Sequence, residues 1–172
     1  MVLVGLMGAG KSTVGRRLAK RLGLTFVDSD SAIEDASGFS AAEVYERYGE
    51  ADFRDGERRL VARLIEGEVR VIATGGGAYV DARTRELLNE RAITVWLDAP
   101  VDILTERTGR RDTRAQLRKG DPKATLTKLS EQRRPAYEEA HIHIMSGDGA
   151  HRDVVDAIVR ALEDHIGRSQ RA

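Results

Sequence analysis

A glycine-rich segment near the start of the chain has the residue types and spacing of a phosphate-binding loop. Residues 5–12 read Gly-Leu-Met-Gly-Ala-Gly-Lys-Ser, which matches the pattern G-x-x-x-x-G-K-[ST]. The glycines let successive backbone N–H groups point at one anion, and a following helix N-terminus adds partial positive charge. Lys11 would supply a full charge to the β- and γ-phosphates of a nucleotide, and the Ser12 hydroxyl could ligate Mg²⁺. We call residues 5–12 the phosphate loop.

Two carboxylates follow the next apolar segment. Residues 24–28 read as a strand, and the chain continues as Asp28-Ser29-Asp30. Ligands of parallel α/β sheets gather beyond the carboxyl ends of the strands, so both aspartates are expected beside the phosphate loop. One could hold Mg²⁺ through water, and the other could accept a proton from an attacking hydroxyl. The alternative for Asp30 is helix capping, because "SAIEDA" follows it.

Two further segments could contact a small anionic substrate. Residues 52–57, "DFRDGE", place Arg54 and Glu57 three apart on one helix face, where the alternative is a surface ion pair. Residues 74–78, "TGGGA", end a strand with three glycines. Such glycines can bring the backbone close to a ligand, although a tight turn is the simpler explanation.

Arginines are concentrated in the last third of the chain. Arg133 and Arg134 precede Pro135, and a proline bend in a helix could aim one arginine inward. A polar segment could be a solvated loop, or a lid whose arginine reaches the transferring phosphate and excludes water. Its basic residues are Arg107, Arg110, Arg111, Arg114, Arg118 and Lys119.

The elements that must position these groups alternate between strand and helix. Strands are expected at 2–4, 24–28, 69–77, 92–98 and 141–144, the last as an edge strand. Helices are expected at 11–22, at 31–66 with breaks near Gly38 and Gly49, and at 81–90. Three more are expected: one that starts at Pro100, one that follows residue 122 and ends at about Glu139, and one along 154–166. This alternation favours parallel strands with right-handed crossovers, and therefore a three-layer α/β sandwich with a five-stranded parallel sheet.

Composition limits the class of protein. The chain has 172 residues, which suits one domain, and 28 basic residues balance 28 acidic ones. This balance argues against a general nucleic-acid or membrane-surface role. There is no cysteine, and no apolar run approaches the roughly 18 residues that span a bilayer. A cytoplasmic protein without membrane or nucleic-acid partners is expected.

Taken together, these motifs resemble those of the shikimate kinase family over nearly the whole chain. The segments "GLMGAGKST", "DSD", "DFR", "TGGGA" and "RRPAY" carry the resemblance, in this order. It implies a fold similar to that of nucleoside monophosphate kinases, with strand order 2-3-1-4-5, in a single domain over 1–172. The substrate-binding segment would be about 31–60 and the lid about 107–122. The implied reaction transfers the γ-phosphoryl of ATP to the 3-hydroxyl of shikimate, in aromatic amino acid biosynthesis, with Mg²⁺ and a monomeric enzyme.

The resemblance also implies roles on the nucleotide side. Lys11 would stabilise the transferring phosphoryl group, Ser12 would bind Mg²⁺, and Asp28 would hold the metal's shell through water. The nucleotide would contact the phosphate loop and two arginines, of which Arg107 looks like the residue that packs on adenine and Arg114 like the lid arginine. The full nucleotide-binding set is Gly8, Ala9, Gly10, Lys11, Ser12, Thr13, Arg107 and Arg114.

On the acceptor side, Asp30 would hydrogen-bond the shikimate hydroxyls and orient or deprotonate the attacking one. Arg54 and Arg133 would grip the carboxylate. The remaining residues would line the site, with the two aromatic side chains as its apolar wall: Gly75, Gly76, Gly77, Tyr45 and Phe53.

One departure concerns the lid. The family commonly has arginine-proline-leucine-leucine there, whereas this chain has Arg114-Ala115-Gln116-Leu117. Losing the proline should loosen the loop before closure. Two alternatives stay open: a gluconate-type kinase, which need not keep the arginine pair and triple glycine, and a non-catalytic ATP-binding module, against which Asp30 argues.

Three other features have simpler explanations. His141 and His143 could suggest a metal site but suit an exposed edge face better. Trp96 is expected in the core. The arginines of the first helix, Arg16, Arg17 and Arg21, are expected to form a solvated face.

Overall fold

A computed structural model describes residues 1–109 and 120–171 of the chain. The strands are β1 (Val2–Val4), β2 (Thr25–Asp28), β3 (Arg70–Ala73), β4 (Thr94–Asp98) and β5 (Ile142–Met145). The helices are α1 (Lys11–Leu22), α2 (Ser29–Ser37), α3 (Ala41–Ile65), the short η1 (Ala78–Val80), α4 (Ala82–Arg91), α5 (Val101–Gly109), α6 (Pro122–Tyr137) and α7 (His151–Ser169).

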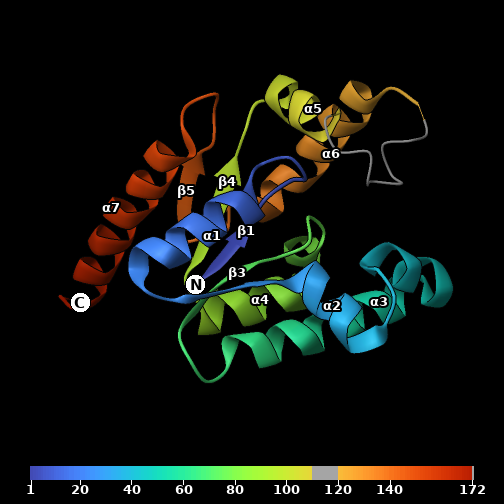
Figure 1. Cartoon of the computed structure of the whole chain (residues 1–172), viewed down its shortest axis with the longest axis horizontal. Coiled ribbons are helices and arrows are strands. Elements are labelled where there is room, and N and C mark those ends of the chain that lie inside the picture. Colours follow the sequence, from blue (N-terminus) through green and yellow to red (C-terminus); the bar gives the residue numbers. More distant parts are fainter. Residues whose placement is uncertain (110–119, 172) are drawn as a thin grey trace.

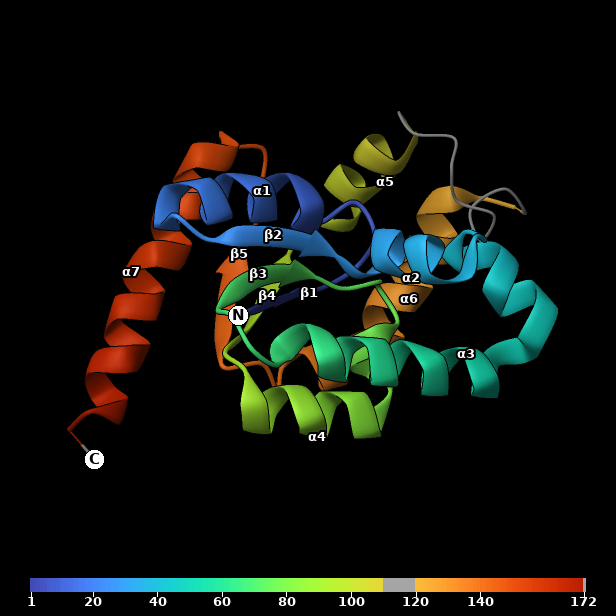
Figure 2. The same cartoon turned by 60° about the horizontal axis from the view of Figure 1, so that its bottom comes forward.

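The five strands form one sheet in the order β2-β3-β1-β4-β5, and every neighbouring pair is parallel. Helices cover both faces: α1 and α7 lie together on one, and α3 and α4 lie together on the other (Figure 1, Figure 2). The predicted three-layer α/β fold with strand order 2-3-1-4-5 is therefore confirmed. Because the strands run parallel, their carboxyl ends meet at one edge of the sheet.

The core is centred on β1 and β4. All three residues of β1 are fully buried, as expected for a central strand covered on both faces. Trp96, in the middle of β4, is 4% exposed and packs with the other core residues, as predicted. Among the described residues, no helix is both long and apolar enough to cross a membrane.

The helical stretch expected at 31–66 is divided where its glycines lie. Gly38 ends α2 in the left-handed conformation, with φ 75°, and α3 begins with a capping box between Ser40 and Glu43. Gly49 interrupts α3 with φ 80° and ψ 173°, a conformation open almost only to glycine. Both predicted breaks are confirmed.

Two boundaries differ from the sequence expectation. Helix α2 begins at Ser29, two residues earlier than expected, because the Asp28 side chain accepts a hydrogen bond from the Asp30 amide. Asp28 is therefore the cap, and the capping alternative for Asp30 was wrong. Strand β3 ends at Ala73, so the three glycines expected at its end lie outside the sheet. Residues 75–77 are called the glycine loop below.

Candidate active site

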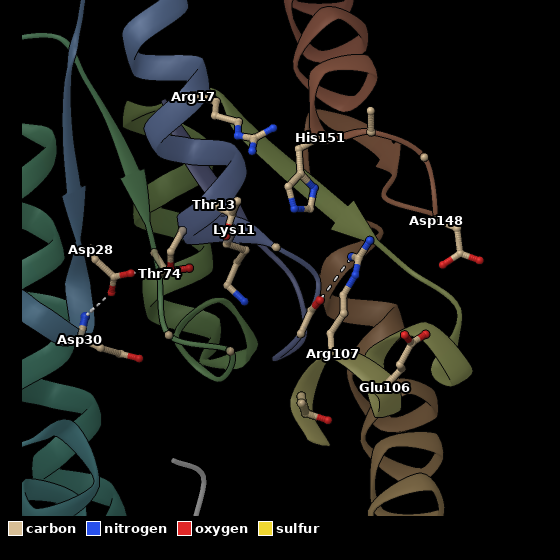
Figure 3. A pocket seen from close by; sticks show the side chains of 18 residues that line it. Lys11, Thr13, Arg17, Asp28, Asp30, Thr74, Glu106, Arg107, Asp148 and His151 are labelled. Atoms are coloured by element: carbon tan, nitrogen blue, oxygen red, sulfur yellow. Dashed lines mark hydrogen bonds between the residues drawn. The ribbon is translucent and has the colours of Figure 1, made fainter. Parts of the chain in front are cut away.

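A cleft of about 710 Å³ opens at the carboxyl edge of the sheet. Figure 3 shows Lys11 reaching into its middle, with Asp28 and Asp30 on one side and Arg107 and His151 on the other. Segments far apart in the chain therefore share one cavity. It is lined by Gly8, Gly10, Lys11, Ser12, Thr13, Arg17, Asp28, Asp30, Thr74, Gly75, Gly76, Glu106, Arg107, Thr108, Asp148, Gly149, Ala150 and His151.

The phosphate loop is held by its glycines and by Lys11. A Cβ at Gly5 would overlap the carbonyl oxygen of Leu97, so only glycine lets the loop leave β1 this close to β4. Gly10 precedes α1 with φ 91° and no side-chain cap, which leaves the first N–H groups of the helix directed at the cleft. The buried Lys11 ammonium donates to the carbonyls of Gly5 and Leu6 at 2.7 and 2.9 Å. The loop thus presents backbone donors and one fixed cation.

Two oxygen-bearing side chains, those of Ser12 and Asp28, lie together beside the phosphate loop. The Ser12 hydroxyl donates to Asp28 Oδ2 at 2.6 Å, while Asp28 Oδ1 accepts from the Asp30 amide. A hydroxyl and a carboxylate at the mouth of a phosphate site are the ligand types that Mg²⁺ prefers. The residues present therefore fit a divalent cation that accompanies a nucleotide.

Asp30 faces the backbone of the glycine loop together with a second carboxylate. A Cβ at Gly75 would lie 2.8 Å from Asp30 Oδ1 and 3.2 Å from Glu57 Oε1. The Gly75 N–H donates to the Ser29 hydroxyl at 3.0 Å, which ties the loop to the first turn of α2. The glycine at position 75 therefore gives the backbone room to approach both acids.

Arg54 is held by Glu57 inside the protein. Glu57 is 2% exposed, accepts from Arg54 Nη1, and has its pKa raised mainly by burial, against the opposing effect of Arg54. The Arg54 guanidinium lies so close to Gly77 that any Cβ there would overlap it. The alternative of a surface ion pair was therefore wrong, because helix spacing predicts the pairing but not its burial.

The carbonyl of Gly76 joins the glycine loop to α6. It accepts from Arg133 Nη1 at 3.0 Å and from the Tyr137 hydroxyl at 2.5 Å. Burial raises the pKa of Tyr137 to about 12, so this phenol stays a donor. Each glycine of the loop thus contacts a different functional side chain, which a plain tight turn would not require.

The predicted aromatic wall lies on α3. Tyr45 and Phe53 meet edge to face with ring centroids 5.5 Å apart, and Phe53 is buried next to Arg54. Neither ring lines the 710 Å³ cleft, nor do Ala9, Gly77, Arg54 and Arg133. The two arginines reach the glycine loop from α3 and α6, so the predicted acceptor residues meet around that loop.

Arg107 connects three segments on the other side of the cleft. Its guanidinium donates to the carbonyl of Gly147 at 2.6 Å and to that of Gly8 at 3.4 Å. It also donates to the Ser146 hydroxyl at 3.4 Å. A side chain of α5 therefore fixes the phosphate loop against the segment that follows β5.

The sequence interpretation missed two residues of this side. Arg17 is exposed, as predicted for a solvated face, and it also lines the cleft, which the sequence interpretation did not predict. His151 begins α7, and burial together with Arg17 and Arg107 lowers its pKa, so its imidazole is neutral near pH 7. Arg114, Ala115 and the other arginines of the expected lid between 110 and 119 lie outside the described residues.

His141, which precedes β5, and His143, within β5, have partners in the fold. His141 Nδ1 accepts from the Thr94 amide at 3.1 Å, and the His143 ring stacks on Trp96. Across residues 1–109 and 120–171, no three His, Cys, Asp or Glu side chains gather as metal ligands.

A sequence model of shikimate kinases matches residues 7–163. The chain belongs to the shikimate kinase family. The shikimate kinase of Caulobacter vibrioides is 53% identical over 162 residues, which cover 94% of this chain and 81% of the relative. A solved shikimate kinase from Acinetobacter baumannii in complex with shikimate is 41% identical, with a TM-score of 0.89 over 95% of this chain and 92% of that one.

The fold extends to kinases outside the shikimate kinase family. A solved gluconokinase from Sinorhizobium meliloti has a TM-score of 0.64 over 95% of this chain and 90% of that one. Its identity to this chain is 18%, so the likeness shows a shared fold alone.

Proposed function

We propose that this protein transfers the γ-phosphoryl group of ATP to the 3-hydroxyl of shikimate, giving 3-phosphoshikimate. The observation that carries the proposal is the juxtaposition, at one sheet edge, of a phosphate loop with an acceptor site built from one carboxylate and two arginines. Membership of the shikimate kinase family and the likeness to a relative in complex with shikimate support it.

The nucleotide is bound by the phosphate loop and its surroundings. Backbone N–H groups of residues 8–13 hold the phosphates, and the Lys11 ammonium stabilises the charge that develops on the transferring group. Arg107 packs on the adenine, and Arg114 contributes its charge to the γ-phosphate. Ser12 and Asp28 would hold Mg²⁺, which would supply positive charge to neutralise the phosphate oxygens.

Shikimate is bound around the glycine loop. The carboxylate pairs with Arg54 and Arg133, because guanidinium groups make strong charge-assisted hydrogen bonds to carboxylates. Residues 75–77 line the ring, and Tyr45 and Phe53 provide its apolar wall. The substrate-binding segment is therefore about 31–60, together with the glycine loop and the end of α6.

Asp30 is the group that acts on the attacking hydroxyl. It hydrogen-bonds the hydroxyl groups of shikimate and accepts the proton of the 3-hydroxyl as its oxygen bonds to phosphorus. The bond between phosphorus and the β,γ-bridging oxygen breaks, and ADP leaves. Such a transfer needs positioning and charge stabilisation more than covalent chemistry, which suits a site of fixed cations.

The deciding experiment measures ADP release in a coupled assay with ATP, Mg²⁺ and either shikimate or gluconate. Turnover with shikimate and none with gluconate is expected, and the reverse pattern would contradict the proposal. Asp30→Asn should lower kcat at least about 100-fold while leaving ADP binding within about twofold. Equal turnover by this variant would remove the role of Asp30, and no turnover by the wild type with any acceptor would indicate an ATP-binding module.

We further propose that the chain acts in the cytoplasm as a monomer in a single domain. The balance of 28 basic and 28 acidic residues supports a protein without nucleic-acid or membrane partners. Light scattering of the purified protein at several concentrations tests the oligomeric state.

A further inference from the structure

The end of α6 carries two consecutive arginines, Arg133 and Arg134, whose side chains contact different strand ends. Arg133 donates to the carbonyl of Gly76, which follows β3. Arg134 donates to the carboxylate of Asp98, the last residue of β4, at 3.1 Å. Consecutive helical residues are about 100° apart around the axis, so fixing one side chain also fixes where the other points.

Pro135 makes such an anchor necessary. A proline inside a helix has no N–H and leaves the carbonyl four residues earlier, that of Glu131, without its ladder bond. The orientation of the last turn then depends more on side-chain contacts than in a regular helix. Two such contacts are present, the Tyr137 hydroxyl on Gly76 and the Arg134 guanidinium on Asp98.

The Asp98 end of this contact is rigid. Its side chain is 11% exposed, Asp98 pairs with Met145 in the β4–β5 register, and its carbonyl accepts from the Ser146 amide just beyond β5 at 2.6 Å. The Arg134 guanidinium also lies over the Trp96 ring, 5.0 Å from its centroid. His143 stacks on the same ring and places Nε2 3.2 Å from the same carboxylate oxygen. Arg134 is thus held between a ring and a carboxylate that both belong to the sheet.

Arg134 has a second acidic partner, Glu138, which is more exposed and more distant than Asp98. Glu138 lies 3.8 Å away on the next turn, and both side chains are about half exposed. Exposed ion pairs at this spacing contribute little to the stability of a helix, because water and salt screen their charges. Asp98, nearly buried and fixed to the sheet, is the partner that can define the direction of the helix end.

We infer that Asp98 is a positioning residue for the acceptor substrate: by holding Arg134, it sets the rotation of the last turn of α6 and so directs Arg133 at the glycine loop. Asp98 does not line the 710 Å³ cleft, and it acts through Arg134. The inference rests on the proposed function in one respect, the role of Arg133 in binding the shikimate carboxylate.

The test is the steady-state kinetics of Asp98→Asn, which keeps the side-chain shape and removes the charge. The KM for shikimate should rise about fivefold, with kcat and the KM for ATP within about twofold, since loss of a charge-assisted hydrogen bond loosens only Arg133. Arg134→Lys keeps the charge at a half-exposed position but loses the guanidinium geometry, so it should give the same pattern without loss of folding. Glu138→Gln is the matched control and should change neither KM.

A double-mutant cycle decides whether Asp98 acts through Arg133. In an Arg133→Ala background, Asp98→Asn should raise the KM for shikimate no further. Additive effects, equal changes in both KM values, or a lowered Tm with unchanged KM values would overturn the inference. An Arg133→Ala variant with a normal KM for shikimate would instead contradict the carboxylate role in the proposed function, so the two failures are distinguishable.

Discussion

Gly75 and Gly77 have different neighbours, and this difference separates their functions. A Cβ at Gly75 would meet the carboxylates of Asp30 and Glu57, whereas a Cβ at Gly77 would meet the guanidinium of Arg54. Neither glycine has a positive φ, so alanine is compatible with the backbone at both positions. A methyl group added at either position therefore displaces a side chain of the acceptor site rather than straining the loop.

We predict that Gly75→Ala mainly lowers kcat, because Asp30 must move from the attacking hydroxyl. Gly77→Ala should mainly raise the KM for shikimate, because Arg54 must move from the carboxylate. A tenfold effect corresponds to about 1.4 kcal/mol, which a displaced hydrogen bond to a charged group readily provides. Steady-state kinetics of both variants measure the split, and identical kinetic defects would count against these separate assignments.

Glu57 makes the stability of the protein depend on pH. Burial raises its pKa above the ordinary value of 4.5, so the folded state binds this proton more tightly than the unfolded state. The resulting stabilisation is present below about pH 4.5 and is lost as the pH rises through the raised folded pKa. The like charges of Asp30 and Asp81 act in the same direction, and Arg54 opposes them.

We therefore expect the wild type to lose stability relative to Glu57→Gln as the pH rises from 4.5 toward 7. The glutamine cannot ionise, so its own contribution stays constant over this range. Urea unfolding of both proteins at several pH values gives the difference in the free energy of unfolding. A difference independent of pH would show that Glu57 titrates normally.

At the scale of elements, α3 contains two glycines in contrasting conformations. Gly49 interrupts the helix with φ 80° and ψ 173°, and Gly56 is helical; a Cβ at either would meet no atom within 4 Å. Both positions therefore have room for a methyl group, and only their backbone conformations differ. The interruption lies inside the expected substrate-binding segment, between Tyr45 and Phe53.

Gly49→Ala should destabilise the protein by about 1–3 kcal/mol, because a side chain is strained in this conformation. Gly56→Ala, the matched control, should stabilise it by about 0.4–1 kcal/mol through a less flexible unfolded chain. Denaturant unfolding measures both. Equal effects of the two substitutions would mean that the break in α3 is not maintained by glycine.

The elements and their order could be predicted from the sequence, because apolar periodicity and glycine positions are local signals. The phosphate loop, Asp28 and Asp30 were located in the same way, since strand ends converge in a parallel sheet. Three features could not be predicted from local signals. They are the burial of Glu57, the position of Arg17 at the cleft, and the contact between Arg134 and Asp98. Each depends on which face of one helix meets another element, which no local pattern specifies.

At the scale of the whole molecule, the proposed function divides the cleft and its surroundings into a nucleotide side and an acceptor side. Arg107 secures the first by joining α5, the phosphate loop and the segment after β5, with partners as far as 99 residues away in sequence. Arg54 and Arg133 secure the second around the glycine loop. The two sides share the phosphate loop but use separate anchors.

Arg107→Ala should therefore raise the KM for ATP by about tenfold and leave the KM for shikimate within about twofold. It should also lower Tm by several degrees, since three hydrogen bonds between distant segments are lost. Kinetics and thermal unfolding of the same preparation provide both values. A rise in the KM for shikimate alone would place Arg107 on the acceptor side.

The ammonium of Lys11, bonded to the carbonyls of Gly5 and Leu6, has one more consequence. Much of the side chain's rotamer freedom is lost during folding, before any nucleotide arrives, so binding ATP restricts it little further. The arriving phosphate then has to compete with two carbonyl oxygens for the same cation. A single weakly held anion competes poorly, whereas a triphosphate that also binds the loop's N–H groups competes well. We therefore expect the loop to favour long phosphate chains over free phosphate.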